Sequence, residues 1–309
     1  MWVFFNGGFQ EHQPGPSAAE HGQLGFQNRG LTFGEGLFEV VRILEGVPVF
    51  FFEHLDRMKS SARQLGFDVE ALHEPSGDQA LFFQALELAR RNGLHDGELY
   101  LQLTRGEDVL RDHRYPPASW PGTFFMLAFA LRKFSPLTWQ TGAKLFVYPD
   151  LRHGLCAHKT TSLMANVMAK NHAYQKGGYE ALMYRSDAQG KYVTEGGSSS
   201  YFLVKGGTVC TPEVDNILPG ITRGKICDLL REQGIPLQER RVYLQEFLEA
   251  DEVFLTSTVS RVMPVASIEE EAFAVPGDIT RQLMEKYQGR IEHEIHRLHS
   301  MANAKGVEV

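Results

Sequence analysis

Hydrophobic and polar positions in the first part of the chain alternate between strand-like and helix-like patterns. β-branched and aromatic residues concentrate in several stretches and predict strands there. From residue 53 the apolar side chains recur on one helical face, and a second such pattern follows. Residues 10–27 are rich in proline, glycine and histidine, so a loop is expected. The predicted strands cover residues 1–9, 37–43, 47–52, 98–104 and 122–130, and the second helix covers 79–92.

The second part of the chain repeats this mixture. Strands are predicted at residues 143–148, 180–184, 201–204 and 252–255, and helices up to about 174, from about 222, and over 279–301. Residues 133–142, with Pro136 among them, are the best candidate for a linker. A chain of 309 residues is long enough for two ordinary domains.

Composition narrows the class of protein. The chain is 43% hydrophobic and 11% aromatic, enough for packed cores. Its formal net charge of −7 argues against a nucleic-acid partner held mainly through phosphates. The first ten residues lack the basic lead of a signal peptide, and the longest apolar run, residues 124–131, is too short for a bilayer. Three cysteines without metal-ligand spacing suggest free thiols in a reducing cytoplasm.

The most informative stretch is CAHKTTSLMANVMAK, residues 156–170. Lys159 stands directly before Thr160, Thr161 and Ser162, which we expect to be helix N-caps because an apolar helical pattern follows. A lysine at the positive end of a helix loses its proton more readily. Schiff-base chemistry needs such a neutral amine. On this segment alone, an ordinary surface lysine is the simpler interpretation.

Two other patterns carry little weight alone. The stretch NRGLTFGEGLFEV begins at residue 28 and contains a G-x-G that does not extend to the nucleotide-binding G-x-G-x-x-G. Three histidines, His293, His296 and His299, lie on the last predicted helix, with a spacing that differs from H-E-x-x-H. They indicate a solvated face, and no metal site is expected.

The ordered set of motifs resembles the class IV (fold-type IV) aminotransferases, which use pyridoxal 5'-phosphate. These include D-amino-acid aminotransferase, branched-chain aminotransferase and aminodeoxychorismate lyase. The resemblance runs from about residue 28 to 288 through NRGLTFGEGLFEV, EHLDR, the lysine at 159, VTEGGSSS, ILPGITR and ADEVFLTST. It implies an α+β, two-domain architecture with the cofactor at the domain interface. We expect a smaller N-terminal domain at 1–132, a linker at 133–138, and a larger C-terminal domain at 139–309 that carries the lysine.

The same resemblance assigns roles to residues at the cofactor. Lys159 matches the catalytic lysine that binds the cofactor and shuttles the proton, and Glu195 matches the carboxylate facing the pyridine nitrogen. Arg57 matches the phosphate arginine. The remaining expected contacts are the serine pair Ser198 and Ser199, the ring contact Leu218, the helix start Gly220, Ile221 and Thr222, and the hydroxyls of Ser257 and Thr258. Gly197 stands where some relatives have serine.

Substrate recognition divides the family. The loop GEDVLRDHRYPP carries Arg111 and His113, which look like the pair that holds the substrate α-carboxylate across the dimer in D-amino-acid aminotransferase. Phe38 departs from this pattern, because it occupies the place of a tyrosine that shares the contact. Losing a neutral hydrogen bond to a charged group costs roughly 1.5–3 kcal/mol.

The resemblance therefore implies a homodimeric transaminase that moves an amino group, most simply from a D-amino acid, to a 2-oxo acid. The alternatives within the family are a branched-chain amino acid aminotransferase and the aminodeoxychorismate lyase. A serine hydrolase using Ser198, Ser199 or Ser200 would need a nucleophile elbow that the sequence lacks. A dimeric interaction module without cofactor is also conceivable, but the complete set of lysine, glutamate and phosphate residues argues against it.

Overall fold

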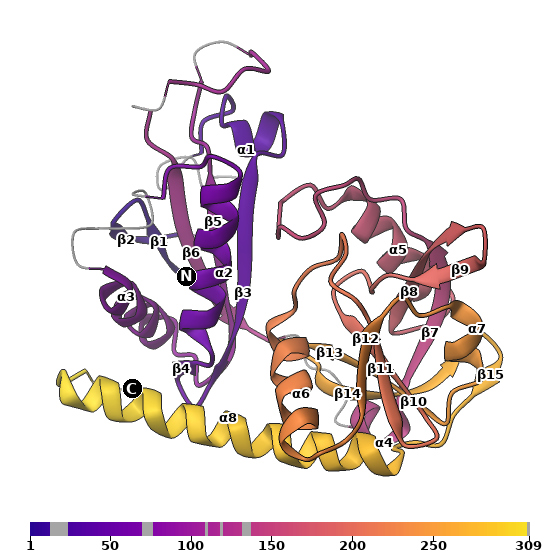
Figure 1. The fold of residues 1–309 in the computed structure, drawn as a ribbon. Coiled ribbons are helices and arrows are strands. Elements are labelled where there is room, and N and C mark those ends of the chain that lie inside the picture. Colours follow the sequence, from indigo (N-terminus) through magenta and orange to yellow (C-terminus); the bar gives the residue numbers. More distant parts are fainter. Residues whose placement is uncertain (13–23, 70–76, 109–110, 118–119, 132–136, 308–309) are drawn as a thin grey trace. The chain divides into compact units, whose positions relative to one another are not determined.

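The computed structural model describes residues 1–12, 24–69, 77–108, 111–117, 120–131 and 137–307, and these form two compact units (Figure 1). Unit 1 comprises Met1–Arg132, His158–Ser162 and Ile291–Val309; unit 2 comprises Lys133–Ala157 and Leu163–Arg290. A single break at 133–138 was expected, yet the short segment that carries Lys159 groups with unit 1. Residues 132–136, most of the expected linker, lie outside the described residues.

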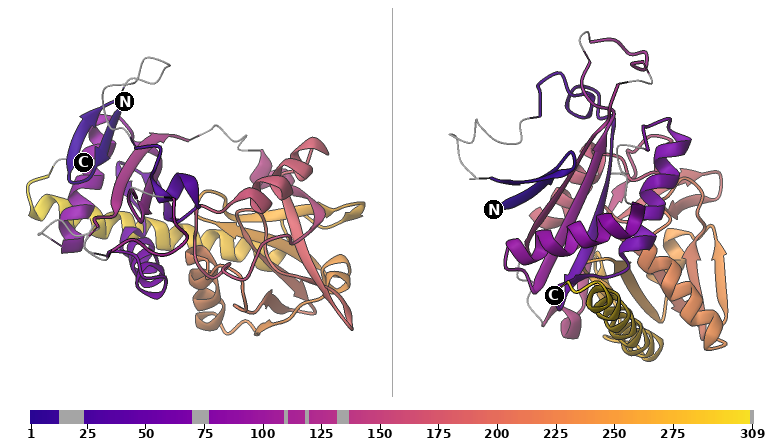
Figure 2. Two further views of the ribbon diagram at one scale, coloured as in Figure 1. Left: turned by 90° about the horizontal axis from the view of Figure 1, so that it is seen from above. Right: turned by 90° about the vertical axis from the view of Figure 1, so that its left-hand side faces the viewer.

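Unit 1 is built on a six-stranded sheet whose order is β2-β1-β6-β5-β3-β4, with every neighbouring pair antiparallel. Helices α2 and α3 pack on it (Figure 2). The strands are β1 (Trp2–Phe5), β2 (Gly8–Glu11), β3 (Gly36–Leu44), β4 (Val47–Pro48), β5 (Asp96–Thr104) and β6 (Thr123–Ala130), and the helices are α1 (Arg29–Thr32), α2 (Phe51–Gln64) and α3 (Gly77–Arg91).

Two sequence predictions in unit 1 are wrong in detail. The expected strand at 1–9 is a hairpin, because Asn6 and Gly7 adopt positive φ angles of 42° and 87° and reverse the chain. The strand expected at 47–52 ends at Pro48, and the aromatic residues after it turn into α2. Phe51 is fully buried in that helix, and its ring lies 5.7 Å from the ring of Phe82 on α3. Burial against a neighbouring helix thus overrides the β propensity of this run.

The two faces of β3 have different surroundings. Leu37, Val41 and Ile43 are buried, as expected for alternate positions on the face of a sheet that helices cover. Glu39 shares this spacing and is also fully buried, although it is charged. The intervening Phe38 points to the other face, where its ring stacks on Tyr100 of β5 at 5.7 Å. β3 therefore carries a carboxylate on one face and an aromatic ring on the other.

Unit 2 is built on a nine-stranded sheet ordered β12-β11-β10-β13-β14-β7-β8-β9, with β15 paired to β14. Parallel pairs join β7 to β8 and to β14. The strands are β7 (Ala143–Pro149), β8 (Glu180–Asp187), β9 (Gly190–Val193), β10 (Ser200–Lys205), β11 (Thr208–Pro212), β12 (Leu237–Arg240), β13 (Glu252–Ser257), β14 (Arg261–Ile268) and β15 (Glu271–Ala272), and the helices are α4 (Thr138–Thr141), α5 (Met164–Gln175), α6 (Ile221–Glu232) and α7 (Leu244–Leu248). The last helix, α8 (Asp278–Ala304), begins in unit 2, and its residues from Ile291 onward belong to unit 1.

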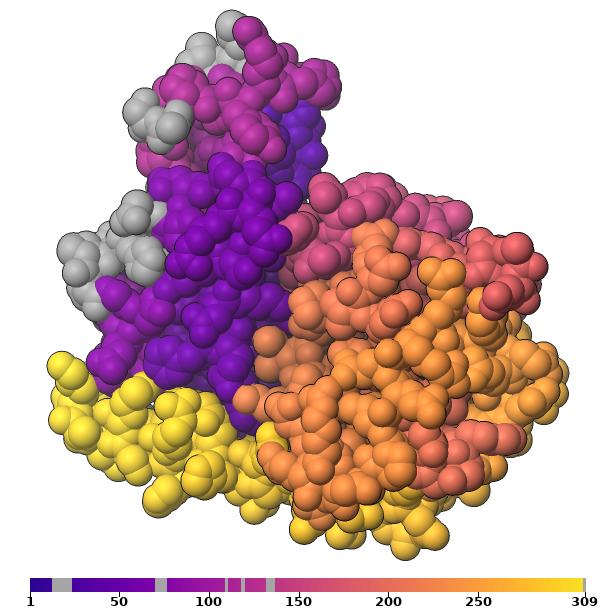
Figure 3. All heavy atoms as spheres, viewed as in Figure 1, coloured from indigo at the N-terminus to yellow at the C-terminus, as the bar shows by residue number. Residues whose placement is uncertain are grey.

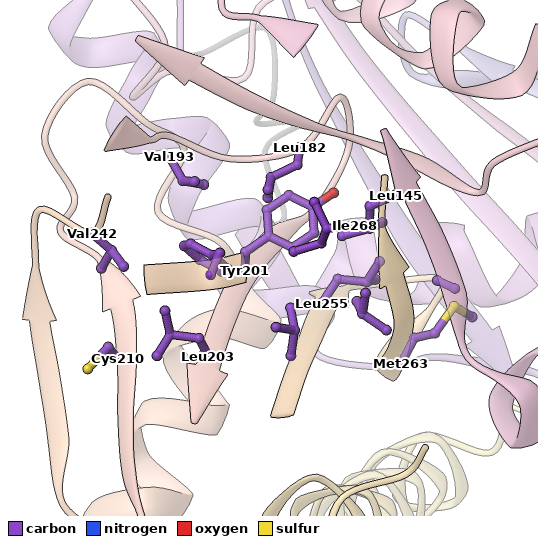
Figure 4. Close-up of a cluster of buried hydrophobic side chains, with 14 residues drawn as sticks. Leu145, Leu182, Val193, Tyr201, Leu203, Cys210, Val242, Leu255, Met263 and Ile268 are labelled. Atoms are coloured by element: carbon purple, nitrogen blue, oxygen red, sulfur yellow. The ribbon is translucent and has the colours of Figure 1, made fainter. Parts of the chain in front are cut away.

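The core of unit 2 gathers around Tyr201, which is fully buried among aliphatic side chains such as Leu182 and Leu255 (Figure 4). Its hydroxyl donates to the carbonyl oxygen of Ala181 at 2.8 Å, so the buried polar group is satisfied. This cluster includes residues of β8, β9 and β10, and the last two of these strands lie on either side of the VTEGGSSS turn in sequence. Across the described ranges, no helix is long and apolar enough to cross a membrane.

Candidate active site

Lys159 lies in a short segment that runs beside the start of β3. The amide of Phe38 donates to the carbonyl oxygen of Lys159 at 2.9 Å, and the amide of Thr161 donates to that of Gly36 at 2.9 Å. Thr160 forms an isolated bridge with Leu37. The lysine side chain continues the contact, because its Nζ lies 4.4 Å from the centroid of the Phe38 ring. Backbone bonds therefore hold Lys159 against one edge of the unit 1 sheet.

The helix-capping role expected for Thr160, Thr161 and Ser162 is wrong. Helix α5 begins at Met164, and Leu163 stands at its N-cap without a side-chain hydrogen bond. The hydroxyls of Thr161 and Ser162 instead donate to the carbonyl oxygen of Gly34, at 3.2 and 3.3 Å. Threonine and serine hydroxyls can donate as well as accept, and here a carbonyl acceptor wins. The expectation that a helix N-terminus helps the Lys159 amine to lose its proton therefore does not hold.

The charged surroundings of Lys159 come from a buried triad on β3 and α2. Nδ1 of His54 lies 2.7 Å from Oε2 of Glu39, and Arg57 donates to the same carboxylate twice, from Nε at 2.8 Å and from Nη2 at 2.7 Å. Burial raises the pKa of Glu39, but the charge of Arg57 and the bonds from both partners lower it to about 2. Burial lowers the pKa of His54, which outweighs the opposing effect of Glu39. The triad is an ionised carboxylate, a neutral imidazole and a guanidinium.

Sequence reasoning identified Arg57 and missed its two partners. His54 and Arg57 stand three residues apart, which places them on one face of α2. Glu39 interrupts an apolar strand at a position whose neighbours two residues away are buried. Together these two patterns could have predicted the triad. A guanidinium has five N–H donors, of which Glu39 takes two.

Glu195 lies in unit 2 and is 5% exposed. Nη1 of Arg152 donates to its Oε1, and the backbone N–H of Leu218 donates to Oε1 at 3.2 Å and to Oε2 at 3.3 Å. The structure therefore brings together Glu195 and Leu218, two residues that the sequence assigned to one cofactor ring. Arg152 was not anticipated, because nothing in the local pattern of residues 150–153 separates it from an ordinary surface arginine.

The GGSSS turn is organised by a second buried carboxylate. Glu180 accepts from the hydroxyl of Ser198 at 2.8 Å and from Nζ of Lys170 at 2.7 Å. A Cβ at Gly197 would lie 3.0 Å from Oε1 of Glu180, which explains why glycine fits this position. Ser199 is buried in the same turn. Ser198 is engaged by a carboxylate on its own unit, and no described histidine bonds to it, which disfavours a serine hydrolase.

The expected phosphate contacts of unit 2 lie at the start of α6 and at the end of β13. Gly220 is the N-cap and offers no side-chain bond, and the first bond of the helix joins the N–H of Gly224 to the carbonyl of Gly220. The N–H groups of Ile221 and Thr222 therefore have no acceptor within the helix, and such groups suit an anion. The other two expected contacts, Ser257 and Thr258, stand where β13 ends, and α6 packs against that strand.

Arg111 and His113 belong to the loop that follows β5. This loop lies near α1 at one end of unit 1 (Figures 1 and 3). The guanidinium carbon of Arg111 is 4.6 Å from the centroid of the Phe33 ring, and the His113 ring meets Phe33 edge-on at 5.2 Å. Arg29, which is 1% exposed, fixes the loop by donating to the carbonyl oxygen of Asp112 at 2.7 Å. The backbone is held, while the Arg111 and His113 side chains are exposed.

The sequence-predicted residues thus form two sets. Unit 1 carries Lys159, Arg57, Phe38, Arg111 and His113. Unit 2 carries the others: Glu195, Ser198, Ser199, Leu218, Gly220, Ile221, Thr222, Ser257 and Thr258. Within the described residues, no group of three or more histidine, cysteine, aspartate or glutamate side chains could hold a metal ion.

Comparisons with known proteins agree on one family. The sequence model of the amino-transferase class IV family matches residues 36–268. The chain is 34% identical to D-alanine aminotransferase of Bacillus licheniformis, covering 95% of this chain and 98% of that protein. It is 33% identical to D-alanine aminotransferase of Listeria monocytogenes, covering 85% and 89%.

Solved structures show the same fold at lower sequence identity. Branched-chain amino acid aminotransferase of Escherichia coli superposes with a TM-score of 0.80 at 24% identity, over 94% of each chain. A putative 4-amino-4-deoxychorismate lyase of Legionella pneumophila gives 0.77 at 24% identity, over 88% of this chain and 96% of that one. The two-domain α+β architecture expected from the sequence is therefore confirmed.

Proposed function

This chain belongs to the class IV aminotransferases, and we propose that it transfers the amino group of a D-amino acid to a 2-oxo acid with pyridoxal 5'-phosphate as cofactor. The observation that carries the D-amino-acid assignment is the pairing of Arg111 and His113 on the Phe33 ring. It joins two carboxylate-binding side chains into one surface. The identity to D-alanine aminotransferases over nearly the whole chain supports the same choice.

The donor set of the chain suits this cofactor. When bound, pyridoxal phosphate supplies an aldehyde carbon for attachment to an amine and a pyridine ring that takes up electrons from the substrate Cα. The chain offers an amine at Lys159, a buried carboxylate at Glu195 and the N–H groups at the start of α6. These match the three chemical parts of the cofactor: the aldehyde, the ring nitrogen and the phosphate.

Lys159 is proposed to hold the cofactor covalently and to carry the proton removed from the substrate Cα. Its amine must be neutral to do either. The adjacent triad limits added positive charge, because His54 stays neutral and Arg57 is paired with the ionised Glu39. The Phe38 ring contacts this amine, with Nζ 4.4 Å from the ring centroid.

Glu195 is proposed to keep the proton on the ring nitrogen. A carboxylate serves this role when it is ionised, because it then only accepts hydrogen bonds. The bonds from Arg152 and from the N–H of Leu218 favour the ionised form. Leu218 is also positioned by this bond, which supports its proposed contact with the ring face.

The phosphate is proposed to bind the N–H groups of Ile221 and Thr222, with the hydroxyls of Ser199, Ser257 and Thr258 nearby and Arg57 adding charge. Anions are favoured at helix N-termini by free N–H groups and by the helix dipole. Tyr287 donates its hydroxyl to Oγ1 of Thr222 at 3.4 Å and so supports that residue.

The substrate carboxylate is proposed to bind Arg111 and His113 of a second copy of the chain, which makes the working unit a homodimer. Both side chains are exposed on this chain, as that role requires.

The cysteines Cys156, Cys210 and Cys227 form no disulfide, which supports a reducing compartment such as the cytoplasm.

A branched-chain amino acid aminotransferase is the second candidate, and Phe38 is the observation that favours it. Phenylalanine has no hydroxyl to donate to a substrate carboxylate. Its ring instead packs on Tyr100 and Lys159, which makes that side of the site apolar.

The test has a chemical and a catalytic arm. Borohydride reduction of the protein loaded with pyridoxal phosphate should fix the cofactor on the peptide containing Lys159, and Lys159→Ala should abolish both labelling and transamination. Lys286→Ala, at an exposed position of α8, is the matched control and should change neither. Wild type is then assayed with both enantiomers of alanine, leucine and glutamate against 2-oxoglutarate and pyruvate. Labelling at another lysine would contradict the cofactor role, and turnover of L-leucine alone would contradict the D-amino-acid assignment.

A further inference from the structure

Glu195 is held by an arginine that is itself fixed by a second carboxylate. Arg152 directs Nη1 to Oε1 of Glu195, and its other edge is taken by Asp150. Nε donates to Oδ1 of Asp150 at 2.9 Å and Nη2 donates to Oδ2 at 2.8 Å. The backbone N–H of Arg152 donates to Oδ1 as well, at 3.0 Å. The guanidinium plane therefore has one orientation, and Glu195 is bonded to it.

This arrangement is buried and electrically balanced. The side chain of Asp150 is fully buried and that of Arg152 is 9% exposed. Arg185 adds a second positive charge, with Nη2 3.1 Å from Oδ2 of Asp150. Two guanidinium groups thus face two carboxylates, Asp150 and Glu195. Burial lowers the pKa of Arg152, but its bonds and charges with the two carboxylates raise it more, so the cation is permanent.

We propose that Arg152 is a positioning residue that sets the orientation and the effective charge of Glu195 toward the cofactor ring. The bridge is specific to arginine, because one planar group bonds Asp150 along one edge and Glu195 through the remaining nitrogen. A lysine supplies the charge without this geometry. Arg152 also favours the ionised form of Glu195, which is the form that accepts the ring proton's hydrogen bond. The inference rests on the proposed role of Glu195.

A double-mutant cycle separates this role from a structural one. Arg152→Met and Glu195→Gln are made singly and together, and two quantities are measured: the absorbance maximum of the bound cofactor and the single-turnover rate of its spectral change with an amino donor. If Arg152 acts through Glu195, Arg152→Met should slow the single-turnover rate at least tenfold and shift the absorbance maximum toward that of Glu195→Gln. The same substitution made in the Glu195→Gln variant should change the rate by less than twofold.

Two further variants complete the experiment. Arg152→Lys keeps the charge, is the fallback if Arg152→Met does not fold, and should recover only part of the rate. Arg185→Met is the matched control, because the contacts described for Arg185 are with Asp150 and with Sγ of Cys156. It should lower the melting temperature and leave the absorbance and the rate within twofold of wild type.

The outcomes distinguish the inference from the function on which it rests. If Glu195→Gln alone leaves the rate and the absorbance unchanged, the proposed role of Glu195 fails. If Glu195→Gln slows the single-turnover rate, but the effects of the two substitutions on that rate simply multiply in the double variant, Glu195 keeps its role and the inference about Arg152 is overturned. Wild-type absorbance and rate in folded Arg152→Met or Arg152→Lys would overturn it as well.

Discussion

Arg111 packs its guanidinium group on the ring of Phe33, with 4.6 Å between the guanidinium carbon and the ring centroid. Phe33 also receives the guanidinium group of the buried Arg29, at 4.5 Å. The same ring meets His113 edge-on. One aromatic side chain thereby links the anchored part of unit 1 to both proposed carboxylate-binding residues. The exposed pair depends on Phe33 for its orientation.

Replacing Phe33 with leucine should weaken substrate binding without affecting the cofactor. Cation–π contacts at exposed sites contribute about 0.5–1 kcal/mol, so we expect the KM for the amino donor to rise by about twofold to fivefold. The cofactor spectrum and kcat should stay close to wild type. Steady-state kinetics with D-alanine measures the change. Leu31→Ala is the matched control, because Leu31 lies on α1 and is 71% exposed. An equal KM effect in both variants would contradict the role of the ring.

Replacing Glu39 with glutamine should destabilise the protein strongly. The substitution leaves Arg57 and His54 buried without their carboxylate, and breaking a buried pair from one side costs roughly 3–5 kcal/mol. Glu87→Gln is an informative comparison. The pKa of Glu87 is also lowered to about 2, by the bond from Arg90 first, but this carboxylate lies near the surface, with 27% of its side chain exposed. We expect less than about 1 kcal/mol there. Urea unfolding of the two variants measures the difference.

The same triad predicts how stability depends on pH. The pKa of Glu39 is lower in the folded state, about 2 against an ordinary value of 4.5, so its contribution is complete above pH 4.5 and is lost as the pH falls toward 2. The pKa of His54 is lowered from 6.5, so the unfolded chain takes up the proton first and stability begins to fall below pH 6.5. Unfolding free energy should therefore decline in two stages on acidification. Glu39→Gln should lack the second stage, and an unchanged acid profile in that variant would contradict this account.

Gly197 offers a prediction about the GGSSS turn. A Cβ at this position would lie 3.0 Å from Oε1 of Glu180 and 3.2 Å from the carbonyl oxygen of Asn166, so Gly197→Ala should destabilise by about 1–3 kcal/mol. Gly289→Ala is the control, because that glycine is exposed within α8 and nothing lies within 4 Å of its added Cβ. Alanine there should stabilise the helix by about 0.5–1 kcal/mol. Thermal melts of the two apo proteins should move in opposite directions.

The parts of the fold that could be predicted from sequence are those governed by periodicity. The alternation of β3 and the long amphipathic pattern of α8 identified both elements, since burial of one face repeats every two or about 3.6 residues. The interactions that organise the site have no such period. Glu39 and Arg57 are 18 residues apart, and Arg152 and Glu195 are 43 apart. Buried ion pairs form between residues that the fold brings together, so the sequence showed one member of each pair.

The misassigned caps at residues 160–162 have the same origin. A threonine or serine before an apolar helical pattern usually accepts a bond from the helix. Here Thr161 and Ser162 find the carbonyl oxygen of Gly34, 127 and 128 residues away in sequence. Gly34 adopts a φ of 70°, a conformation that favours glycine and turns the chain just before β3. A tertiary contact with Gly34 thus replaces the expected local contact with the helix. It places the segment that carries Lys159 beside the start of β3, where Phe38 lies.

The substrate preference can be decided by changing Phe38 and Arg111 separately. Phe38→Tyr places a hydroxyl on the ring beside Lys159, where a hydrogen bond to a substrate carboxylate would contribute roughly 1.5–3 kcal/mol. The KM for D-alanine or D-glutamate should therefore fall. Arg111→Ala removes the charge that supplies most of the substrate binding, so the KM for the D-amino acid should rise in this variant, while the cofactor spectrum stays intact. This rise should be larger than the fall in KM that Phe38→Tyr produces. Tyr100→Phe controls for a hydroxyl on the neighbouring stacked ring. If Arg111→Ala leaves the KM for D-amino acids unchanged and wild type prefers L-leucine or L-valine, the branched-chain assignment replaces the one proposed here.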